Sequence, residues 1–182
     1  MKGYGTILAT FVVGVVVGAV GMLLVHPTGD LGTEVGLRPL RSGATEAVNA
    51  TTERYTNKDY GLSLSYPAEL TVQEFPQSGA LTIVFQHPSE EKGFQIFIVP
   101  YPEAQISQAR IKTDLAGGPM DNPVEIVLAG NIPAVHFESR APIIGESTEV
   151  WFIHAGHLYE VTTYRAHDAW LASILGTLQF TN

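Results

Sequence analysis

An uncharged apolar run at residues 7–25 restricts the folding of this chain more than any other feature of its sequence. The run reads ILATFVVGVVVGAVGMLLV, and Thr10 is its only polar side chain. As a helix with a rise of 1.5 Å per residue it would extend about 29 Å, close to the hydrocarbon thickness of a bilayer. We therefore predict one transmembrane helix over residues 7–25, in contact with membrane lipid.

A cleaved signal peptide is the alternative interpretation of this segment. Ala19 and Gly21 are small residues of the kind that precede a cleavage site. The apolar core of a signal peptide is about 7–15 residues long, whereas this run continues past the candidate site to Val25. The length favours an uncleaved anchor within residues 1–25, and the cleaved form stays as the alternative.

The residues around and within the span predict an orientation and a contact between helices. Lys2 precedes the span, and the first Lys or Arg residues after it are the distant Arg38 and Arg41. Under the positive-inside rule we expect a single-pass cell-membrane protein with a cytoplasmic N-terminus and an extracytoplasmic C-terminal domain. Gly14 and Gly18 form a G-x-x-x-G pair, which predicts a homodimer through the span. Chance occurrence is the alternative, because glycine is common in membrane helices.

Composition separates a linker from a folded domain and excludes several classes of function. Residues 26–52 contain glycine and proline without a hydrophobic period, as in a flexible linker, so the domain is expected over residues 53–182. The net charge is −8 and the ten Lys and Arg residues are scattered, which argues against nucleic acid as a partner. The absence of cysteine excludes disulfides, thiolate nucleophiles and cysteine-ligated zinc.

Alternating and continuous apolar segments predict a sheet within the domain. In residues 61–67, Leu62, Leu64 and Tyr66 alternate with serine, so they are expected to face a core on a strand that ends at Pro67. Further strands are expected at residues 53–57, 70–76, 79–88, 93–101 and 124–140, the last being a pair. The nearly continuous apolar runs at 79–88 and 93–101 indicate central strands covered on both faces.

The strongest hairpin signal is at residues 147–165. A two-residue turn at Ala155-Gly156 would place three pairs of residues opposite each other. These pairs are His154 with His157, Phe152 with Tyr159, and Val150 with Val161.

Two helices are expected beside the sheet. The first covers residues 102–115 with Pro102 at its first position, and the second begins at Asp168 as N-cap. Apolar residues of the second helix follow the helical period at Leu171, Ile174, Leu175 and Leu178. The predicted class is α+β, with a mostly antiparallel sheet of six to eight strands flanked by helices.

Three stretches of the domain match a known pattern, at residues 55–72, 154–165 and 174–182. The pattern is a Tyr-Gly strand that ends in Tyr-Pro, then Gly-x-x-Tyr-x-x-Thr, then a closing helix that runs into a Phe-ended strand. The residues that fit it are Tyr60, Gly61, Tyr66, Pro67, Gly156, Tyr159, Thr162 and Phe180. In this the chain resembles the PsbP-like family, which is named for an extrinsic subunit of photosystem II and includes many bacterial proteins of unknown role. The resemblance implies an α/β/α sandwich but no particular activity, and the predicted anchor departs from the photosynthetic members.

The candidate metal ligands are His154 and His157, with His136 from the preceding strand and Glu149 or Glu160 nearby. Two imidazoles that face each other across a tight turn are suitable ligands for zinc or copper. A closed site needs three or four convergent ligands. The alternative is therefore a solvated pair at a hairpin tip, with His136 buried and bonded to a backbone carbonyl.

We expect no motif of catalysis in this sequence, S-x-x-K included. G-x-S-x-G, H-E-x-x-H and phosphate-binding glycine patterns do not occur, and the acidic pair Glu146 and Glu149 is expected to be solvated. We expect no catalytic residues, no cofactor and no enzymatic activity. The favoured function is a membrane-tethered, extracytoplasmic domain for protein interaction or assembly support. The alternative is a module that binds a metal or small ligand through the hairpin histidines.

Overall fold

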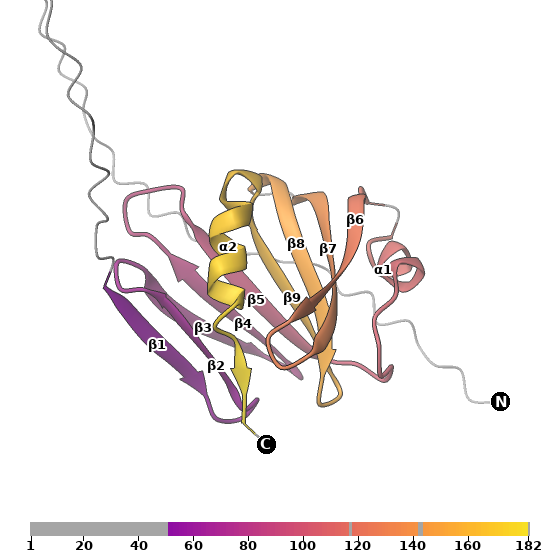
Figure 1. The fold of residues 1–182 in the computed structure, drawn as a ribbon, viewed down its shortest axis with the longest axis horizontal. Helices are drawn as coiled ribbons and strands as arrows, with labels where there is room; N and C mark the ends of the chain where they lie inside the picture. Colours follow the sequence, from indigo (N-terminus) through magenta and orange to yellow (C-terminus); the bar gives the residue numbers. More distant parts are fainter. Residues whose placement is uncertain (1–50, 117, 142–143, 182) are drawn as a thin grey trace, which may run out of the picture. The chain divides into compact units, whose positions relative to one another are not determined.

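A computed structural model describes residues 51–116, 118–141 and 144–181, which form strands and two α-helices (Figure 1). The predicted membrane span at 7–25, its Gly14 and Gly18 pair, and nearly all of the 26–52 linker lie outside the described residues. Among the residues that are described, no helix is long and apolar enough to cross a membrane.

Seven strands form a large sheet in which every neighbouring pair is antiparallel. Their spatial order is β3-β4-β5-β9-β8-β7-β6, so β3 and β6 are the edges and β9 lies at the centre. The strands are β3 Thr71–Gln77, β4 Ala80–Gln86, β5 Gly93–Pro100, β6 Asp121–Leu128, β7 Ile132–Ala141, β8 Gly145–His154 and β9 His157–Tyr164. This agrees with the predicted antiparallel sheet of six to eight strands.

A second sheet of three strands was not foreseen. It consists of β1 Thr52–Asn57, β2 Leu62–Pro67 and the short closing strand β10 Gln179–Phe180, in the order β1-β2-β10. The two ends of the domain therefore meet in one small antiparallel sheet. The predicted entrance strand at residues 61–67 exists as β2, but it does not belong to the large sheet.

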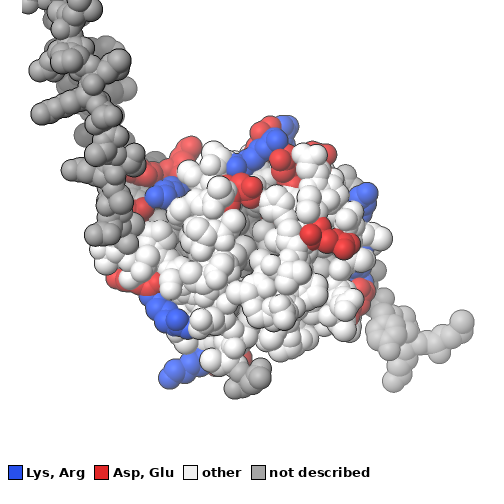
Figure 2. All heavy atoms as spheres, in the orientation of Figure 1, with Lys and Arg blue, Asp and Glu red and all other residues white. Residues whose placement is uncertain are grey.

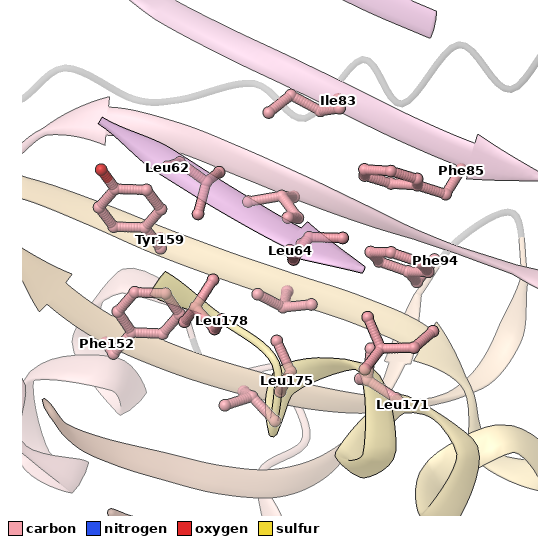
Figure 3. Close-up of a cluster of buried hydrophobic side chains, with 14 of the residues drawn as sticks. Leu62, Leu64, Ile83, Phe85, Phe94, Phe152, Tyr159, Leu171, Leu175 and Leu178 are labelled. Carbon is pink, nitrogen blue, oxygen red and sulfur yellow. The ribbon is translucent and has the colours of Figure 1, made fainter. Parts of the chain in front are cut away.

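The main core lies between the two sheets and helix α2, Asp168–Leu175. Leu62, Leu64 and Tyr66 of β2 are buried in it, as their alternation predicted. Figure 3 shows β2 leucines packed among aromatic residues of the large sheet and leucines that follow β9. The predicted apolar face of the last helix is confirmed, because Leu171, Ile174, Leu175 and Leu178 are all buried.

A smaller core lies on the opposite face of the large sheet, under helix α1, Gln108–Asp114. Ile111 of α1 packs with Trp151 and Leu158 of the two central strands and with residues of β7. The helix begins later than the predicted start at Pro102. Ser107 is its N-cap, and the Ser107 hydroxyl accepts a hydrogen bond of 3.2 Å from the backbone N–H of Arg110. The first N–H groups of a helix have no partner within the helix, and a side-chain cap provides one of them with an acceptor. A proline at the first helical position provides no such acceptor.

The β8–β9 hairpin has the predicted turn and register. Ala155 and Gly156 have φ angles of +47° and +76°, the conformation that joins two twisted antiparallel strands in two residues. The three predicted cross-strand pairs are all present.

The expectation that β4 and β5 are covered on both faces was wrong, because the second face of each strand is only half-buried. Complete burial on both faces is found on β8 and β9 at the centre of the sheet.

Candidate functional site

The hairpin histidines lie together at the tip of β8 and β9. His154 is directly opposite His157, and its ring stacks on Phe180 with a centroid distance of 3.9 Å. Burial lowers the pKa of His154 and so favours its neutral form. The His157 Nδ1 atom lies 3.1 Å from the carbonyl oxygen of Ala155. If Nδ1 carries the proton of that hydrogen bond, Nε2 is left as the free acceptor.

His136 does not join this pair. Its strand neighbour on β8 is Val150, four residues before His154, which corresponds to about 13 Å along a strand. The Nε2 atom of His136 lies 2.9 Å from Oδ1 of Asp168, so its partner is a carboxylate and not the expected backbone carbonyl. Among the described residues, no three His, Cys, Asp or Glu side chains gather as metal ligands.

Asp168 has a different role from the one its sequence position suggested. It is the first residue of α2, and the cap position belongs to His167, which makes no capping side-chain hydrogen bond. The Asp168 carboxylate instead links the start of α2 to His136 on β7. A negative charge in the first helical turn also favours the helix dipole.

Two carboxyl groups are buried at the centre of the large sheet, on the face that α1 covers. Glu149 on β8 and Glu160 on β9 are each 7% exposed. The Glu149 carboxylate accepts hydrogen bonds of 2.7 Å from the Thr162 hydroxyl and 3.2 Å from the Ser147 hydroxyl. The described residues make no hydrogen bond to the side chain of Glu160. The expectation that Glu149 is solvated was therefore wrong.

Burial raises the pKa of both carboxyl groups. The pKa of Glu149 is raised to about 7, although the hydroxyl groups that donate to it act in the opposite direction. The pKa of Glu160 is raised to about 8, by burial first and then by the negative charges of Glu149 and Asp114. Among the described residues, the buried indole Nε1 of Trp151 has no hydrogen-bond partner, yet it lies close enough to Glu149 to favour the charged form of that carboxyl group.

The carboxyl groups and the hydroxyl beside them are shielded from solvent. Ser147 is 0% exposed, so a substrate cannot reach its hydroxyl, which donates to Glu149 as a structural group. The alternation of β8 indicates this burial in hindsight. Trp151 and Ile153 share the face of Glu149, while Val150 and Phe152 occupy the other face, so both faces carry apolar residues.

The expected absence of catalytic motifs was wrong in one respect, because Ser89 and Lys92 form a Ser-x-x-Lys spacing in the loop between β4 and β5. In some hydrolases a lysine at this spacing activates the serine. Here the Lys92 ammonium forms an ion pair of 2.6 Å with Glu69 and lies over the ring of Trp170. The Ser89 hydroxyl is near His87 at 3.5 Å. The lysine is therefore engaged with a carboxylate and not with the serine.

The most exposed large apolar side chains of the described residues lie on an edge of the large sheet. Val127 and Val124 of the edge strand β6 are 69% and 53% exposed. Val127 is opposite Pro133 of β7, which has no N–H group to give to the ladder. A proline fits an antiparallel ladder at a pair that exchanges no hydrogen bonds. The backbone N–H and C=O groups of Val127, and of Glu125 two residues before it, therefore point to the open side.

On the face that Figure 2 shows, the basic side chains are separated from one another by acidic and uncharged residues. A continuous basic patch, of the kind that phosphate backbones require, is not present on this face.

Comparison with known proteins identifies the fold. No family model and no curated protein matches the sequence. The solution structure of cyanobacterial PsbP (CyanoP) from Synechocystis is similar, with a TM-score of 0.51 and 12% sequence identity, over 77% of this chain and 99% of that chain. The domain has a PsbP-like fold. This confirms the resemblance seen in the sequence, and at such low identity it extends to the fold alone.

Four of the residues that carried the resemblance have structural roles in the domain. Gly61 has a φ of +62° and lies against the backbone carbonyl of Thr181, where a Cβ atom would overlap it. Tyr159 is buried in the main core, and Thr162 donates to Glu149. Phe180 packs on His154 at the end of the closing strand. These motif residues therefore help to hold the domain together.

Proposed function

We propose that this chain is a membrane-tethered, extracytoplasmic domain that binds another protein or supports an assembly, without enzymatic activity. The observation that carries the proposal is the open edge of β6 with the exposed Val124 and Val127. An edge strand with apolar side chains invites pairing, and natural proteins usually protect such an edge. The tether and the orientation rest on the apolar run at 7–25 and its flanking charges.

Other groups that could take part in chemistry already have partners within the domain, which supports a role in binding over catalysis. Glu149 is held by two hydroxyl groups, and His136 is paired with Asp168. A catalytic group needs access to a substrate and a free partner for proton transfer. The exposed side chains of β6 are apolar, acidic or, at one position, an amide, and these suit contact with a protein surface.

Site-specific photo-crosslinking in membranes tests the proposal. A photoreactive residue at position 127 of the full chain is expected to give a covalent adduct of higher mass. The matched control is position 112 on α1, where Lys112 is also exposed, and it is expected to give none. Absence of an adduct at positions 124, 125 and 127, with the protein folded, would contradict a binding role for this edge. Recovery of the full chain from the soluble fraction would contradict the tether.

A second candidate function is the binding of a metal or small ligand at the hairpin tip. The observation in its favour is that His154 and His157 are directly opposite each other. Calorimetric titration of the full chain in detergent with Zn²⁺ and with Cu²⁺ tests it. Heat that disappears in His154→Ala supports this function, and no heat in the unsubstituted chain ends it.

A further inference from the structure

We infer that the open edge of β6 pairs with the same edge of a second copy of this chain, which joins two large sheets into one. The inference rests on the proposed role as an interaction domain and names its partner. It starts from the free backbone groups of Glu125 and Val127, because two residues spaced by two along a strand present a donor and an acceptor each. These four groups all point to the open side of β6, and another extended strand is the element that can pair with all of them at once.

The positions of these groups define a register. An antiparallel pair centred on Ile126 would place Glu125 opposite Val127 of the second copy, and Val127 opposite its Glu125. Both pairs would then exchange hydrogen bonds, four in total across the interface. Ile126, whose own backbone groups point to β7, would face the second copy's Ile126 as a pair without hydrogen bonds. The arrangement has twofold symmetry and closes at two copies.

Side chains agree with this register on both faces of the sheet. On the face of the main core, Ile126 and Leu128 already pack against the core cluster, and Val124 is exposed beyond them. Pairing would set Val124 beside the second copy's Leu128 and extend that apolar surface. On the other face, Glu125 would lie beside a valine and not beside another Glu125, which avoids like charges directly opposite each other.

The rest of the sheet opposes other modes of pairing. At the other edge, β3 contains Pro76, and its Glu74 accepts a hydrogen bond from the Tyr55 hydroxyl of β1. Such features protect an edge strand, so pairing of β6 with β3 of a second copy into an open fibre is disfavoured. The start of β6 is also protected, by Pro123 and by a register shift between Asp121 and Val124. Residues 124–128 are left as the pairing segment.

Five paired residues bury little surface, so the dimer is expected to be weak in dilute solution. Two chains held in one membrane by the proposed tether would meet at a much higher effective concentration. These considerations favour a second copy over an unrelated strand as the occupant of the edge.

Disulfide trapping tests the register, because the chain has no cysteine of its own. In the full chain in native membranes, Ile126→Cys is expected to give a disulfide-linked dimer under mild oxidation, since Cα atoms in such a pair are about 4.5 Å apart. Val124→Cys and Leu128→Cys chains are expected to link when expressed together, and to link at least fivefold less when expressed alone. The matched control is Gln73→Cys on the exposed part of β3, which is expected to stay monomeric.

A further variant separates the edge contact from chance collision. Val127→Lys is expected to fold normally, because the side chain is 69% exposed, and to reduce the trapped Val124–Leu128 dimer at least fivefold. Phe75→Lys on β3 is the matched control and is expected to leave trapping unchanged. Equal trapping at positions 73 and 126, or in Val124→Cys alone, would overturn the inference. A photo-adduct at position 127 whose mass is not that of two chains would also overturn it while leaving the proposed function standing.

Discussion

Glu160 shows at the residue scale how position in the sheet changes the chemistry of a side chain. Its pKa rises from the ordinary 4.5 to about 8 in the folded chain because it is buried. Between these two values the folded state holds a proton that the unfolded state has released. Unfolding therefore releases a proton, and the free energy of unfolding falls as the pH rises, until it levels off above about pH 8. The effect is on the order of a few kcal/mol.

Substitution of Glu160 by glutamine tests this linkage. Glu160→Gln keeps the size of the side chain and removes its ionisation. It is expected to leave stability nearly unchanged at pH 5 and to raise it at pH 9, where the unsubstituted chain holds a buried negative charge. Urea unfolding of both chains at pH 5, 7 and 9 measures the difference and cancels the contribution of the histidines. Glu125→Gln on the exposed β6 is the control. Parallel curves for Glu160→Gln and the unsubstituted chain would show that Glu160 does not titrate in this range.

Gly61 gives a second prediction, about a residue that the sequence pattern had already marked. Its φ is +62°, and an added Cβ would overlap the carbonyl oxygen of Thr181, whose N–H donates to the Gly61 carbonyl at 2.8 Å. Gly61→Ala is expected to lower the free energy of unfolding by about 3 kcal/mol. The matched control is Gly79→Ala, which has a φ of +79° but nothing within 4 Å of the added Cβ. It is expected to lose about 1 kcal/mol, from the backbone conformation alone. Similar losses in both variants, measured by urea unfolding, would exclude the contact with Thr181.

Local sequence signals were sufficient to predict the burial of some residues and not of others. The alternation of Leu62 and Leu64 with serine showed which side faces the core, because one strand and one face are involved. The burial of Glu149 and Glu160 depends on strands and a helix that come from distant parts of the chain. A polar residue in a strand suggests an exposed face, and only the presence of apolar residues on both faces of β8 argued otherwise.

Helices and strands were predicted well where a short local sequence, such as a turn, determines the structure. The β8–β9 register followed from a two-residue turn, because the turn fixes which residues face each other. The start of α1 was not predicted, because Pro102 and Glu103 also suit a helix start, whereas the cap is formed by Ser107. The apolar period of the last helix was predicted correctly, but its N-cap was not. Asp168 is instead bound to His136 on β7, a partner that sequence spacing does not reveal.

The turn of this hairpin offers a prediction at the scale of the element. Ala155 adopts a φ of +47°, which is unfavourable for alanine and well tolerated by asparagine. Ala155→Asn creates the Asn-Gly pair that this turn prefers, and it is expected to stabilise the chain by about 0.5–1 kcal/mol. Ala155→Val is the control and is expected to destabilise it, because a β-branched residue is strained at positive φ. Thermal unfolding by circular dichroism ranks the three chains. A melting temperature for Ala155→Asn below that of the unsubstituted chain would contradict the expectation.

At the scale of the whole domain, the separate small sheet is what the sequence did not disclose. Periodicity identifies a strand and its buried face, but it does not name the neighbouring strand. Here the last strand, β10, returns to β2 across more than a hundred residues. The small sheet and α2 then cover one face of the large sheet, and α1 covers part of the other. The layered architecture was predictable from the family resemblance, whereas the pairing of the chain ends was not.

Phe180 connects these layers and gives the prediction that belongs to the whole domain. It stands in β10 opposite Leu62, and its ring packs on His154 and near Tyr159, whose ring centroid is 5.4 Å away. Phe180→Ala is expected to lower the free energy of unfolding by about 2–3 kcal/mol, since a half-buried aromatic ring is lost. Because burial lowers the pKa of His154, exposing its ring is expected to raise that pKa toward the ordinary value, which NMR titration measures. Phe75→Ala, on the exposed β3, is the control and is expected to change neither quantity. An unaltered His154 pKa in a destabilised Phe180→Ala chain would mean that the Phe180 ring is not what shields His154 from water.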